Sequence, residues 1–352
     1  MTGIAPHIFR EYDIRGVVER ELTPDVAETI ARAFAAHVRE AAGASAPRIV
    51  VGQDNRVHSP GLADAVARGL AASGAAVLEV GTVPTPALYF ADHELDADAG
   101  VQVTGSHNPP EYNGLKMLVG HRALYGAGIQ ALRERVERGA LAEGRGRREQ
   151  VPDLLDRYVR ALTSRVRLAR PVRVVVDCGN GTTSLVARRV LEGIGARVEA
   201  LFCESDGTFP NHHPDPTVDA NLRDLVRRVR ETGADAGIAF DGDGDRIGVV
   251  DERGEILRGD VLLLVFARDL LRRGRTEKVI YDVKCSRALE EVIGRYGGTP
   301  VMWKTGHSLI KEKMRETGAK LAGEMSGHIF FADDYYGYDD ALYAACRFLE
   351  IL

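Results

Sequence analysis

The chain has 352 residues, 45% of them hydrophobic and 28% charged, which is enough for two or three globular domains. Its formal net charge of −5 argues against a general nucleic-acid-binding protein, which would show a basic excess. The four cysteines are widely spaced and form no C-x-x-C pair, which argues against a zinc ribbon or a disulfide scaffold.

Short β-branched runs alternate with helical patterns along the whole chain. The expected strands are 48–52, 77–80, 99–103, 172–177, 197–203, 237–240, 247–251, 278–283, 299–303 and 320–322. The expected helices include 60–73, about 183–193 and the segment 341–352. This alternation predicts an α/β fold of three similar domains, each a mixed sheet packed between helices.

Two polar segments suggest where these domains meet. Residues 139–150 are charged and contain glycine, which is typical of a linker, and a turn at 251–254 marks a second boundary. We therefore expect domains at 1–145, 146–251 and 252–352. The N-terminus carries no targeting signal and no apolar run approaches ~20 residues, which indicates a cytoplasmic protein without a membrane span.

A loop around Ser106 follows the expected strand 99–103. Pro109, Pro110 and Gly114 exclude a regular helix, and Gly105 would let the backbone approach a ligand closely. The Ser106 hydroxyl could accept a phosphoryl group and pass it on, given a nearby cation and a group that manages the proton. From the local chemistry alone, an ordinary turn capped by serine and asparagine is the simpler interpretation.

The segment 179–184 nearly matches the dinucleotide-binding pattern G-x-G-x-x-G, because it follows a strand and opens a helix. Its third glycine is absent, so an NAD-binding enzyme is a weak alternative. A failure to bind NAD would exclude it.

Asp241, Asp243 and Asp245 alternate with two glycines between two expected strands. Three carboxylates this close would repel one another unless a cation lay among them, and a hard divalent ion such as Mg²⁺ suits oxygen ligands. An EF-hand is rejected because Arg246 stands where that loop requires glycine and because the flanks are strands.

Four segments taken together resemble the α-D-phosphohexomutases, and in particular their bacterial phosphomannomutase/phosphoglucomutase branch. They lie at 9–16 (FREYDIRG), 104–116 (TGSHNPPEYNGLK), 241–246 (DGDGDR) and 323–328 (GEMSGH). Any one match could be accidental. All four in this order are specific, and they extend from the start of the chain almost to its end.

The resemblance implies a role for each matching residue. Ser106 would be the phosphorylated serine, and its phosphate would also ligate a Mg²⁺ ion held by Asp241, Asp243 and Asp245. Lys116 would manage proton or charge near the transferring group.

Other matching residues would act around the reacting centre. His107 would position the phosphoserine and the substrate, Arg15 and Arg246 would approach the reacting group, and Tyr12 would lie nearby.

A third set of matching residues would contact the sugar. Glu324 and Ser326 would bind sugar hydroxyls, His328 would support their loop, and Lys284 and His307 would face the substrate.

The implied reaction interconverts hexose 1-phosphate and hexose 6-phosphate, of mannose or glucose, through a 1,6-bisphosphosugar. The family implies Mg²⁺ as cofactor and glucose 1,6-bisphosphate as activator. The expected partner is a small phosphosugar, with no nucleic acid or membrane, and the expected state is a monomer.

The family's fourth domain, which grips the phosphate that does not react, has no recognisable counterpart before Leu352. We therefore expect weakened binding and turnover. The alternatives are a non-catalytic phosphosugar-binding fragment, a phosphatase that passes the phosphate to water, or a phosphoglucosamine mutase.

Overall fold

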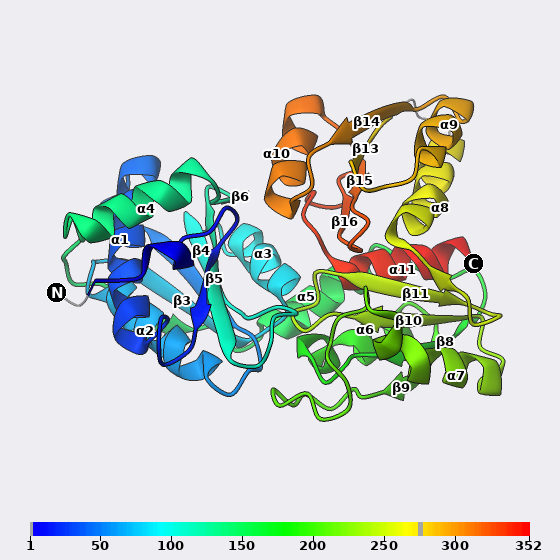
Figure 1. Cartoon of the computed structure of the whole chain (residues 1–352), viewed down its shortest axis with the longest axis horizontal. Coiled ribbons are helices and arrows are strands. Elements are labelled where there is room, and N and C mark those ends of the chain that lie inside the picture. Colours follow the sequence, from blue (N-terminus) through cyan, green and yellow to red (C-terminus); the bar gives the residue numbers. More distant parts are fainter. Residues whose placement is uncertain (1–2, 274–276) are drawn as a thin grey trace. The chain divides into compact units, whose positions relative to one another are not determined.

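The computed structural model describes residues 3–273 and 277–352, which form two compact units, Met1–Leu155 and Asp156–Leu352 (Figure 1). Within the described ranges, no helix combines the length and the apolar character that crossing a membrane requires.

The first unit is built on a mixed sheet with the strand order β1-β5-β4-β2-β3-β7, and β6 pairs with β5. Its strands are β1 (Ile14–Val17), β2 (Arg48–Gln53), β3 (Ala76–Thr82), β4 (Ala99–Val103), β5 (Tyr112–Val119), β6 (Arg122–Ala123) and β7 (Arg147–Gln150). The strands β4, β2, β3 and β7 run parallel, whereas β5 is antiparallel to β1, β4 and β6. The segment Arg147–Gln150 was expected to be linker, and it is instead an edge strand because its backbone pairs with β3.

Helices cover both faces of this sheet. They are η1 (Pro6–Ile8), α1 (Pro24–Ala42), α2 (Ser59–Ala71), α3 (Thr85–Glu94) and α4 (Ala127–Glu137). Ile49 and Val51 of β2 join the core formed with α1 and α2. On the opposite face, a Cβ on Gly52 would lie 3.1 Å from Leu88 of α3. The two faces alternate because successive side chains of a strand point to opposite sides.

The second sheet has the order β12-β11-β10-β8-β9. Its strands are β8 (Arg173–Asp177), β9 (Arg197–Leu201), β10 (Ala236–Phe240), β11 (Ile247–Asp251) and β12 (Ile256–Leu257). Its helical segments are α5 (Leu154–Thr163), η2 (Thr182–Leu185), α6 (Ala187–Gly193), η3 (Asp219–Leu222) and α7 (Arg223–Thr232). The helix expected at 183–193 is divided at Val186, whose φ of −138° lies outside the helical range.

The third sheet has the order β14-β13-β15-β16. Its strands are β13 (Lys278–Asp282), β14 (Thr299–Trp303), β15 (Leu321–Gly323) and β16 (Ile329–Phe331). Its helices are α8 (Gly259–Arg272), α9 (Ala288–Arg295) and α10 (His307–Thr317). The chain thus contains three α/β blocks, each built on a mixed sheet, as the alternation of elements predicts. The boundaries at 145 and 251 remain predictions.

The last helix, α11 (Ala341–Ile351), packs on more than the third sheet. It contacts β10, β11 and α6 as well as β16 and α8, and it is buried over most of its length (Figure 1). The sequence indicated a helix that merely follows the third domain. The structure places it against elements of the second sheet, because its apolar residues surround the helix and need partners on several sides.

Asp340 begins α11 and links it to α5. Its carboxylate accepts the N–H of Tyr343 at 2.9 Å, and it also accepts the hydroxyls of Tyr158 (2.8 Å) and Tyr335 (2.7 Å). Burial raises the pKa of Asp340 to about 6, although these three hydrogen bonds favour the charged form and limit the rise. The N-cap of α11 is therefore a carboxyl group whose ionisation is disfavoured by its burial in the folded protein.

The Asp340→Asn variant tests this cap. Because the folded pKa of Asp340 lies above its ordinary value of 3.8, the folded protein holds the proton more tightly than the unfolded chain. The free energy of unfolding of the wild type should therefore fall as pH rises from about 4 to about 6. The variant should lack this component, worth about 3 kcal/mol for such a pKa change. Urea unfolding of both proteins across this range measures it, and identical pH profiles would contradict the assignment.

Candidate active site

The loop after β4 holds Ser106 in a constrained conformation. The backbone of Ser106 is in the left-handed region, with φ +47°, and the residue is buried, with 4% of its surface exposed. Its N–H donates to Thr104 Oγ1 at 2.8 Å, and its Oγ lies 3.1 Å from His107 Nδ1. A non-glycine residue in this region needs surrounding contacts that hold it there.

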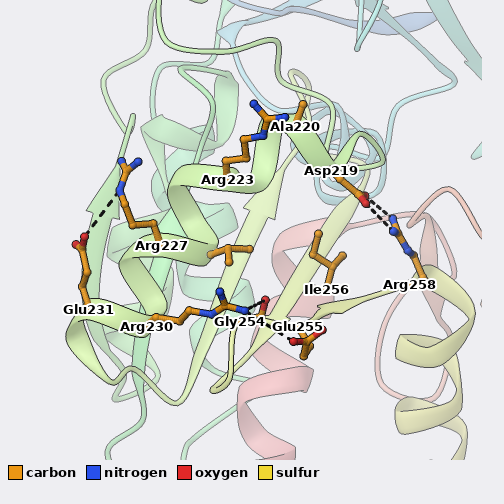
Figure 2. Close-up of a pocket in the computed structure, with 11 residues that line it drawn as sticks. Asp219, Ala220, Arg223, Arg227, Arg230, Glu231, Gly254, Glu255, Ile256 and Arg258 are labelled. Atoms are coloured by element: carbon orange, nitrogen blue, oxygen red, sulfur yellow. Dashed lines mark hydrogen bonds and ion pairs between the residues drawn. The ribbon is translucent and has the colours of Figure 1, made fainter.

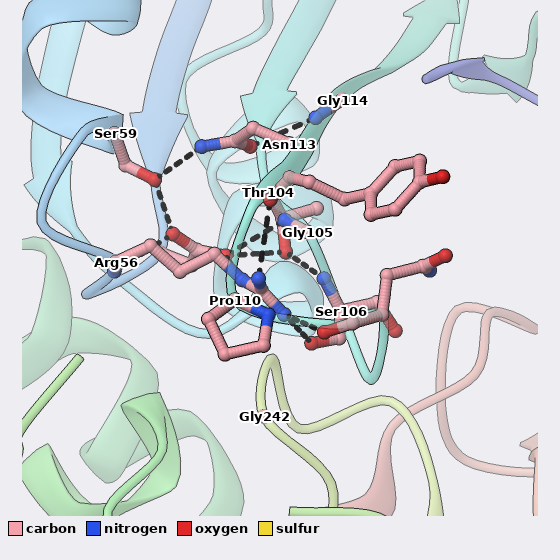
Figure 3. Close-up of polar contacts among 12 residues, drawn as sticks. Arg56, Ser59, Thr104, Gly105, Ser106, Pro110, Asn113, Gly114 and Gly242 are labelled. Carbon is pink, nitrogen blue, oxygen red and sulfur yellow. Dashed lines mark hydrogen bonds and ion pairs between the residues drawn. The ribbon is translucent and has the colours of Figure 1, made fainter. Parts of the chain in front are cut away.

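Arg56 and Asp54 supply those contacts from the end of β2. The buried Arg56 guanidinium donates to the carbonyls of Ser106 (2.8 Å), Asn108 (2.5 Å) and Pro109 (2.8 Å), so it occupies the inside of the loop (Figure 3). Asp54 Oδ2 accepts the N–H of Gly105 and the hydroxyl of Thr104, both at 2.9 Å. The serine is therefore presented by a rigid, hydrogen-bonded cradle.

Gly105 has a role that differs from the expected one. A Cβ at this position would lie 2.3 Å from Arg56 Nε, so the space that a side chain would need is filled by the guanidinium. The sequence suggested that this glycine admits a ligand. The structure shows that it admits Arg56, which then binds the loop from within.

The other residues predicted around Ser106 lie on β1 and β5 or beside them. Arg15 donates to the Gly105 carbonyl at 2.6 Å and forms an ion pair with Asp13. Lys116 is buried on β5, in register with Gln102 of β4, and Tyr12 is half-buried just before β1. Arg15 therefore supports the loop backbone directly.

In the second unit, Asp241, Asp243 and Asp245 are fully buried between β10 and β11. One carboxylate oxygen from each lies within 4.8 Å of the others. The N–H groups of Gly244 (3.0 Å), Asp245 (3.1 Å) and Arg246 (3.1 Å) donate to Asp241 Oδ1, and Gly244 has φ +78°. The loop therefore curls so that the three carboxylates converge.

This carboxylate set fits a hard divalent cation. Three anionic groups in a buried loop repel one another, and a cation with oxygen ligands relieves that repulsion. Monodentate carboxylates also leave coordination positions for a phosphate or for water. The donor chemistry and the convergence both agree with the predicted metal loop.

The segment 179–184 packs directly beneath this loop. Thr182 donates its N–H and its hydroxyl to the Gly242 carbonyl, at 3.0 and 3.2 Å. A Cβ on Gly181 would lie 2.8 Å from the same oxygen. The second glycine of the dinucleotide-like pattern thus allows two loops to touch, which explains it without a nucleotide.

The turn at 323–328 joins β15 to β16 and carries two of the predicted sugar contacts. Glu324 Oε1 accepts the N–H of Gly306 at 2.5 Å, and Ser326 Oγ lies 3.4 Å from Glu324 Oε2. Gly327 has φ +92°, and a Cβ there would lie 2.5 Å from the Ile247 carbonyl. Burial raises the pKa of Glu324 above its usual range.

His328 connects this turn to the aspartate loop. Its Nε2 accepts from Arg246 Nε at 3.0 Å, and its Nδ1 lies 3.0 Å from Asp339 Oδ2 and 3.8 Å from Asp245 Oδ1. Because Nε2 accepts and Nδ1 faces carboxylates, the geometry places the imidazole proton on Nδ1. The tautomer is thus determined by the neighbours.

Asp339 gathers three cationic or ionisable side chains, two from α10 and one from the turn before β16. Lys311 Nζ donates to it at 2.8 Å, and His307 Nδ1 lies 3.5 Å away. The rings of His307 and His328 stack with centroids 5.4 Å apart. Burial alone would raise the pKa of Asp339, but Lys311, His328 and His307 hold it well below its usual range. Asp339 is therefore the anionic centre of this group.

A cavity of about 400 Å³ brings further predicted residues together. Arg246, Lys284 and Ser326 line it, together with Asp282 and Thr305. Asp282 accepts the Thr305 hydroxyl at 2.8 Å and the Met325 N–H at 3.3 Å, so it fixes two walls of the cavity. A phosphosugar-sized ligand would find both cationic and hydroxyl groups here.

A second hollow of about 710 Å³ lies between α7 and the turn that joins β11 to β12 (Figure 2). Its lining includes no residue of the predicted site. Arg258 pairs with Asp219 through two hydrogen bonds of 2.7 and 2.8 Å, and Arg230 donates to the Arg253 carbonyl at 2.8 Å. Most of its positive charge is therefore already compensated.

Sequence reasoning missed Asp54, Arg56, Lys311 and Asp339. Asp54 and Arg56 directly follow a buried strand, and polar residues at that position are a usable signal. Asp339 has no comparable signal, because its partners are 11 to 32 residues away in sequence and meet it only in the folded unit.

The Gly105→Ala variant tests the role of Arg56. Its Cβ would collide with the guanidinium, so the loop or Arg56 must move, at a cost of about 1–3 kcal/mol. Amide hydrogen exchange of the peptide that covers 104–114 should become faster. Gly61→Ala, in α2 with open space around the new Cβ, is the matched control and should leave this peptide unchanged. Equal exchange in both variants would contradict the cradle.

The chain matches three family models over most of its length. They are described as Phosphoglucomutase/phosphomannomutase, alpha/beta/alpha domains I, II and III, and they match residues 6–141, 156–254 and 258–352.

Named relatives and a solved structure agree with this match. The chain is 51% identical over 345 residues to the phosphomannomutase/phosphoglucomutase of Pseudomonas aeruginosa PAO1, covering 98% of this chain and 74% of that protein. It is 46% identical over 353 residues to a phosphoglucomutase of Neisseria meningitidis, covering 100% of this chain and 76% of the relative. A crystal structure of a phosphoglucomutase/phosphomannomutase family protein from Burkholderia thailandensis superposes with a TM-score of 0.94 at 47% identity, covering 99% and 77% of the two chains. The chain therefore belongs to the phosphoglucomutase/phosphomannomutase family of α-D-phosphohexomutases.

Proposed function

We propose that this chain is a phosphosugar mutase that interconverts hexose 1-phosphate and hexose 6-phosphate through a phosphorylated Ser106. Family membership supports the reaction class, and relatives are named for mannose and glucose phosphates. The structural observation that carries the proposal is the coupling of the buried aspartate cluster to the turn at 323–328 through the Arg246–His328 hydrogen bond. One compact unit would thus combine a cation site with sugar-binding groups.

Asp241, Asp243 and Asp245 would hold the divalent cation, which we propose to be Mg²⁺. When bound, the ion supplies positive charge that offsets the negative charge of a transferring phosphoryl group. Arg246 lies at the end of the same loop and lines the cavity, so it is placed to orient an anionic group there.

The sugar would be oriented by groups on the third sheet. Glu324 and Ser326 present a carboxylate and a hydroxyl from one turn, which suits paired sugar hydroxyls. Lys284 lines the same cavity and would bind a substrate phosphate or hydroxyl. His307 and His328, held by Asp339, would complete the polar wall.

Two phosphoryl transfers complete the reaction. In the first, the bond between Ser106 Oγ and phosphorus breaks while the free sugar hydroxyl forms a bond to phosphorus and loses its proton. The resulting 1,6-bisphosphosugar turns around and returns its other phosphate to Ser106, which releases the isomerised product. Lys116 and His107 would stabilise charge and position the serine. Glucose 1,6-bisphosphate would act as activator because it can phosphorylate Ser106 directly.

The serine cradle explains how such a step remains specific. Arg56 and Asp54 fix the loop backbone, so the hydroxyl needs little reorganisation before transfer, and orientation of this kind lowers barriers considerably. We propose that the chain acts as a cytoplasmic monomer.

A coupled assay tests the proposed activity. The chain is given glucose 1-phosphate, Mg²⁺ and a trace of glucose 1,6-bisphosphate, and glucose 6-phosphate is followed, with mannose 1-phosphate in parallel. We expect turnover that Ser106→Ala abolishes, because the variant has no phosphoryl acceptor. Ser164→Ala, at the exposed end of α5, is the matched control and should keep the wild-type rate.

Other outcomes distinguish the alternatives. Phosphate release without isomerised sugar would indicate a phosphatase, and sugar-phosphate binding without turnover would indicate a binding fragment. Turnover only when glucosamine 1-phosphate replaces these two substrates would indicate a phosphoglucosamine mutase. Turnover that survives Ser106→Ala would overturn the proposed role of Ser106.

Asp243→Asn tests the cation site. The amide keeps the shape of the side chain but removes one negative charge, so the affinity for Mg²⁺ should fall by more than about tenfold. Isothermal titration with Mg²⁺ and the Mg²⁺ dependence of the assay both measure this. Glu252→Gln, an exposed acid in the following turn, should change neither. Equal effects of the two variants would contradict the assignment.

A further inference from the structure

A second group of potential metal ligands lies in the first unit, at the C-terminal end of α3. Asp92 and His93 belong to the last turn of this helix, and His121 lies in the two-residue turn between β5 and β6. Gly120 and His121 have φ of +56° and +62°, the combination of a type I′ hairpin turn. The hairpin therefore carries His121 on a tightly determined backbone.

The three side chains are close enough to share one ion. His121 Nδ1 lies 2.7 Å from Asp92 Oδ2, and the rings of His93 and His121 stack with centroids 4.3 Å apart and an interplanar angle of 19°. One ligand atom from each residue lies within 4.8 Å of the others. Around a tetrahedral zinc ion such atoms are about 3.4 Å apart, so binding requires the two imidazole rings to rotate out of their stacked arrangement until their nitrogen lone pairs converge.

Burial and charge both favour a cation at this position. The Asp92 side chain is 1% exposed, whereas that of His121 is 35% exposed, so a buried carboxylate faces an accessible imidazole. The C-terminal end of a helix carries partial negative charge. His121 also borders a cavity of about 340 Å³ that Asp96 and Asp98 line.

A basic residue that lines this cavity is engaged by other groups. Arg48 lines the same cavity, and its guanidinium donates to the Leu95 carbonyl at 2.7 Å. Its backbone N–H donates to Asp98 Oδ2, also at 2.7 Å. Arg48 is therefore held by the α3–β4 connection.

We propose that Asp92, His93 and His121 form a binding site for a divalent transition cation of the zinc class, separate from the aspartate cluster of the second unit. Imidazole nitrogen suits zinc, copper and nickel, whereas magnesium prefers oxygen ligands. Three protein ligands leave one position for water. The ion would fasten the end of α3 to the β5–β6 hairpin, and it takes no part in the proposed phosphoryl transfer.

Zn²⁺ titration of the full chain tests the site. The titration is run in excess Mg²⁺, which occupies the aspartate cluster. It uses a Cys178→Ser/Cys203→Ser background, because the sulfurs of these two cysteines of the second unit lie 2.7 Å from each other and would compete for zinc. We expect one equivalent of Zn²⁺ to bind and to raise the melting temperature. His121→Asn and His93→Gln should each lower the affinity at least about tenfold, since each removes a ligand.

The variants are chosen to keep the fold. Asparagine tolerates the left-handed backbone at 121, and both histidines are only half-buried. His7→Ala is the matched control, because this exposed histidine pairs with Glu21 far from the site in sequence. It should bind Zn²⁺ like the parent chain, and all variants should keep the parent circular dichroism spectrum and mutase rate.

A spectroscopic measurement identifies the ligands. With one equivalent of Cu²⁺ in place of Zn²⁺, pulsed electron paramagnetic resonance should detect two imidazole nitrogens in the parent and one in either histidine variant. Equal Zn²⁺ affinity in the parent and in His121→Asn would overturn the proposal and leave Asp92–His121 as an ordinary ion pair. Because the test reads metal binding, its result is independent of whether the chain is a mutase.

Discussion

The mutual repulsion of Asp241, Asp243 and Asp245 is the constraint on which the site in the second unit depends. Three buried carboxylates remain close together only if backbone donors and a cation compensate them. The loop supplies N–H donors to Asp241, and the connection after β8 packs against its underside through Gly181. The arrangement of β8, β10 and β11 therefore serves to hold negative charge in one place.

The same principle extends to the third sheet through a chain of paired groups. Arg246 donates to His328, His328 faces Asp339, and Asp339 accepts from Lys311. Each buried charge has a partner of opposite sign or a hydrogen-bond donor, which is what makes such a network tolerable away from water. A substrate that entered the cavity beside Arg246 and Lys284 would meet groups whose orientation is already determined.

The first unit holds the Ser106 hydroxyl on a residue whose backbone is in the left-handed conformation. Ser106 keeps its positive φ because Arg56 donates to the loop carbonyls from inside, while Asp54 accepts the N–H of Gly105 and the hydroxyl of Thr104. Gly105 is required for the guanidinium to fit. The conformation of this loop therefore depends on one buried arginine.

Much of the fold and of the candidate site could be predicted from the sequence. Alternating β-branched runs and helical patterns predict the three α/β layers because local hydrophobic periodicity decides the secondary structure. The four motifs identify the serine loop, the aspartate loop and the sugar turn, since each is contiguous in sequence. The strand at Arg147–Gln150 escaped prediction because its charged residues resemble a linker, and only pairing with β3 makes it part of a sheet.

What only the tertiary structure decided are the contacts between residues that are distant in sequence. Arg56 reaches the serine loop from the end of another strand, α11 packs on the second sheet, and Asp339 gathers His307, Lys311 and His328. The position of Arg56 after a buried strand is a local signal, but the contacts themselves leave none, because the partner of a buried charge or an apolar helix face is determined by packing in three dimensions. The sequence by itself determined the family, the order of elements and the candidate site residues, whereas the fold determined which side chains hold those residues in place.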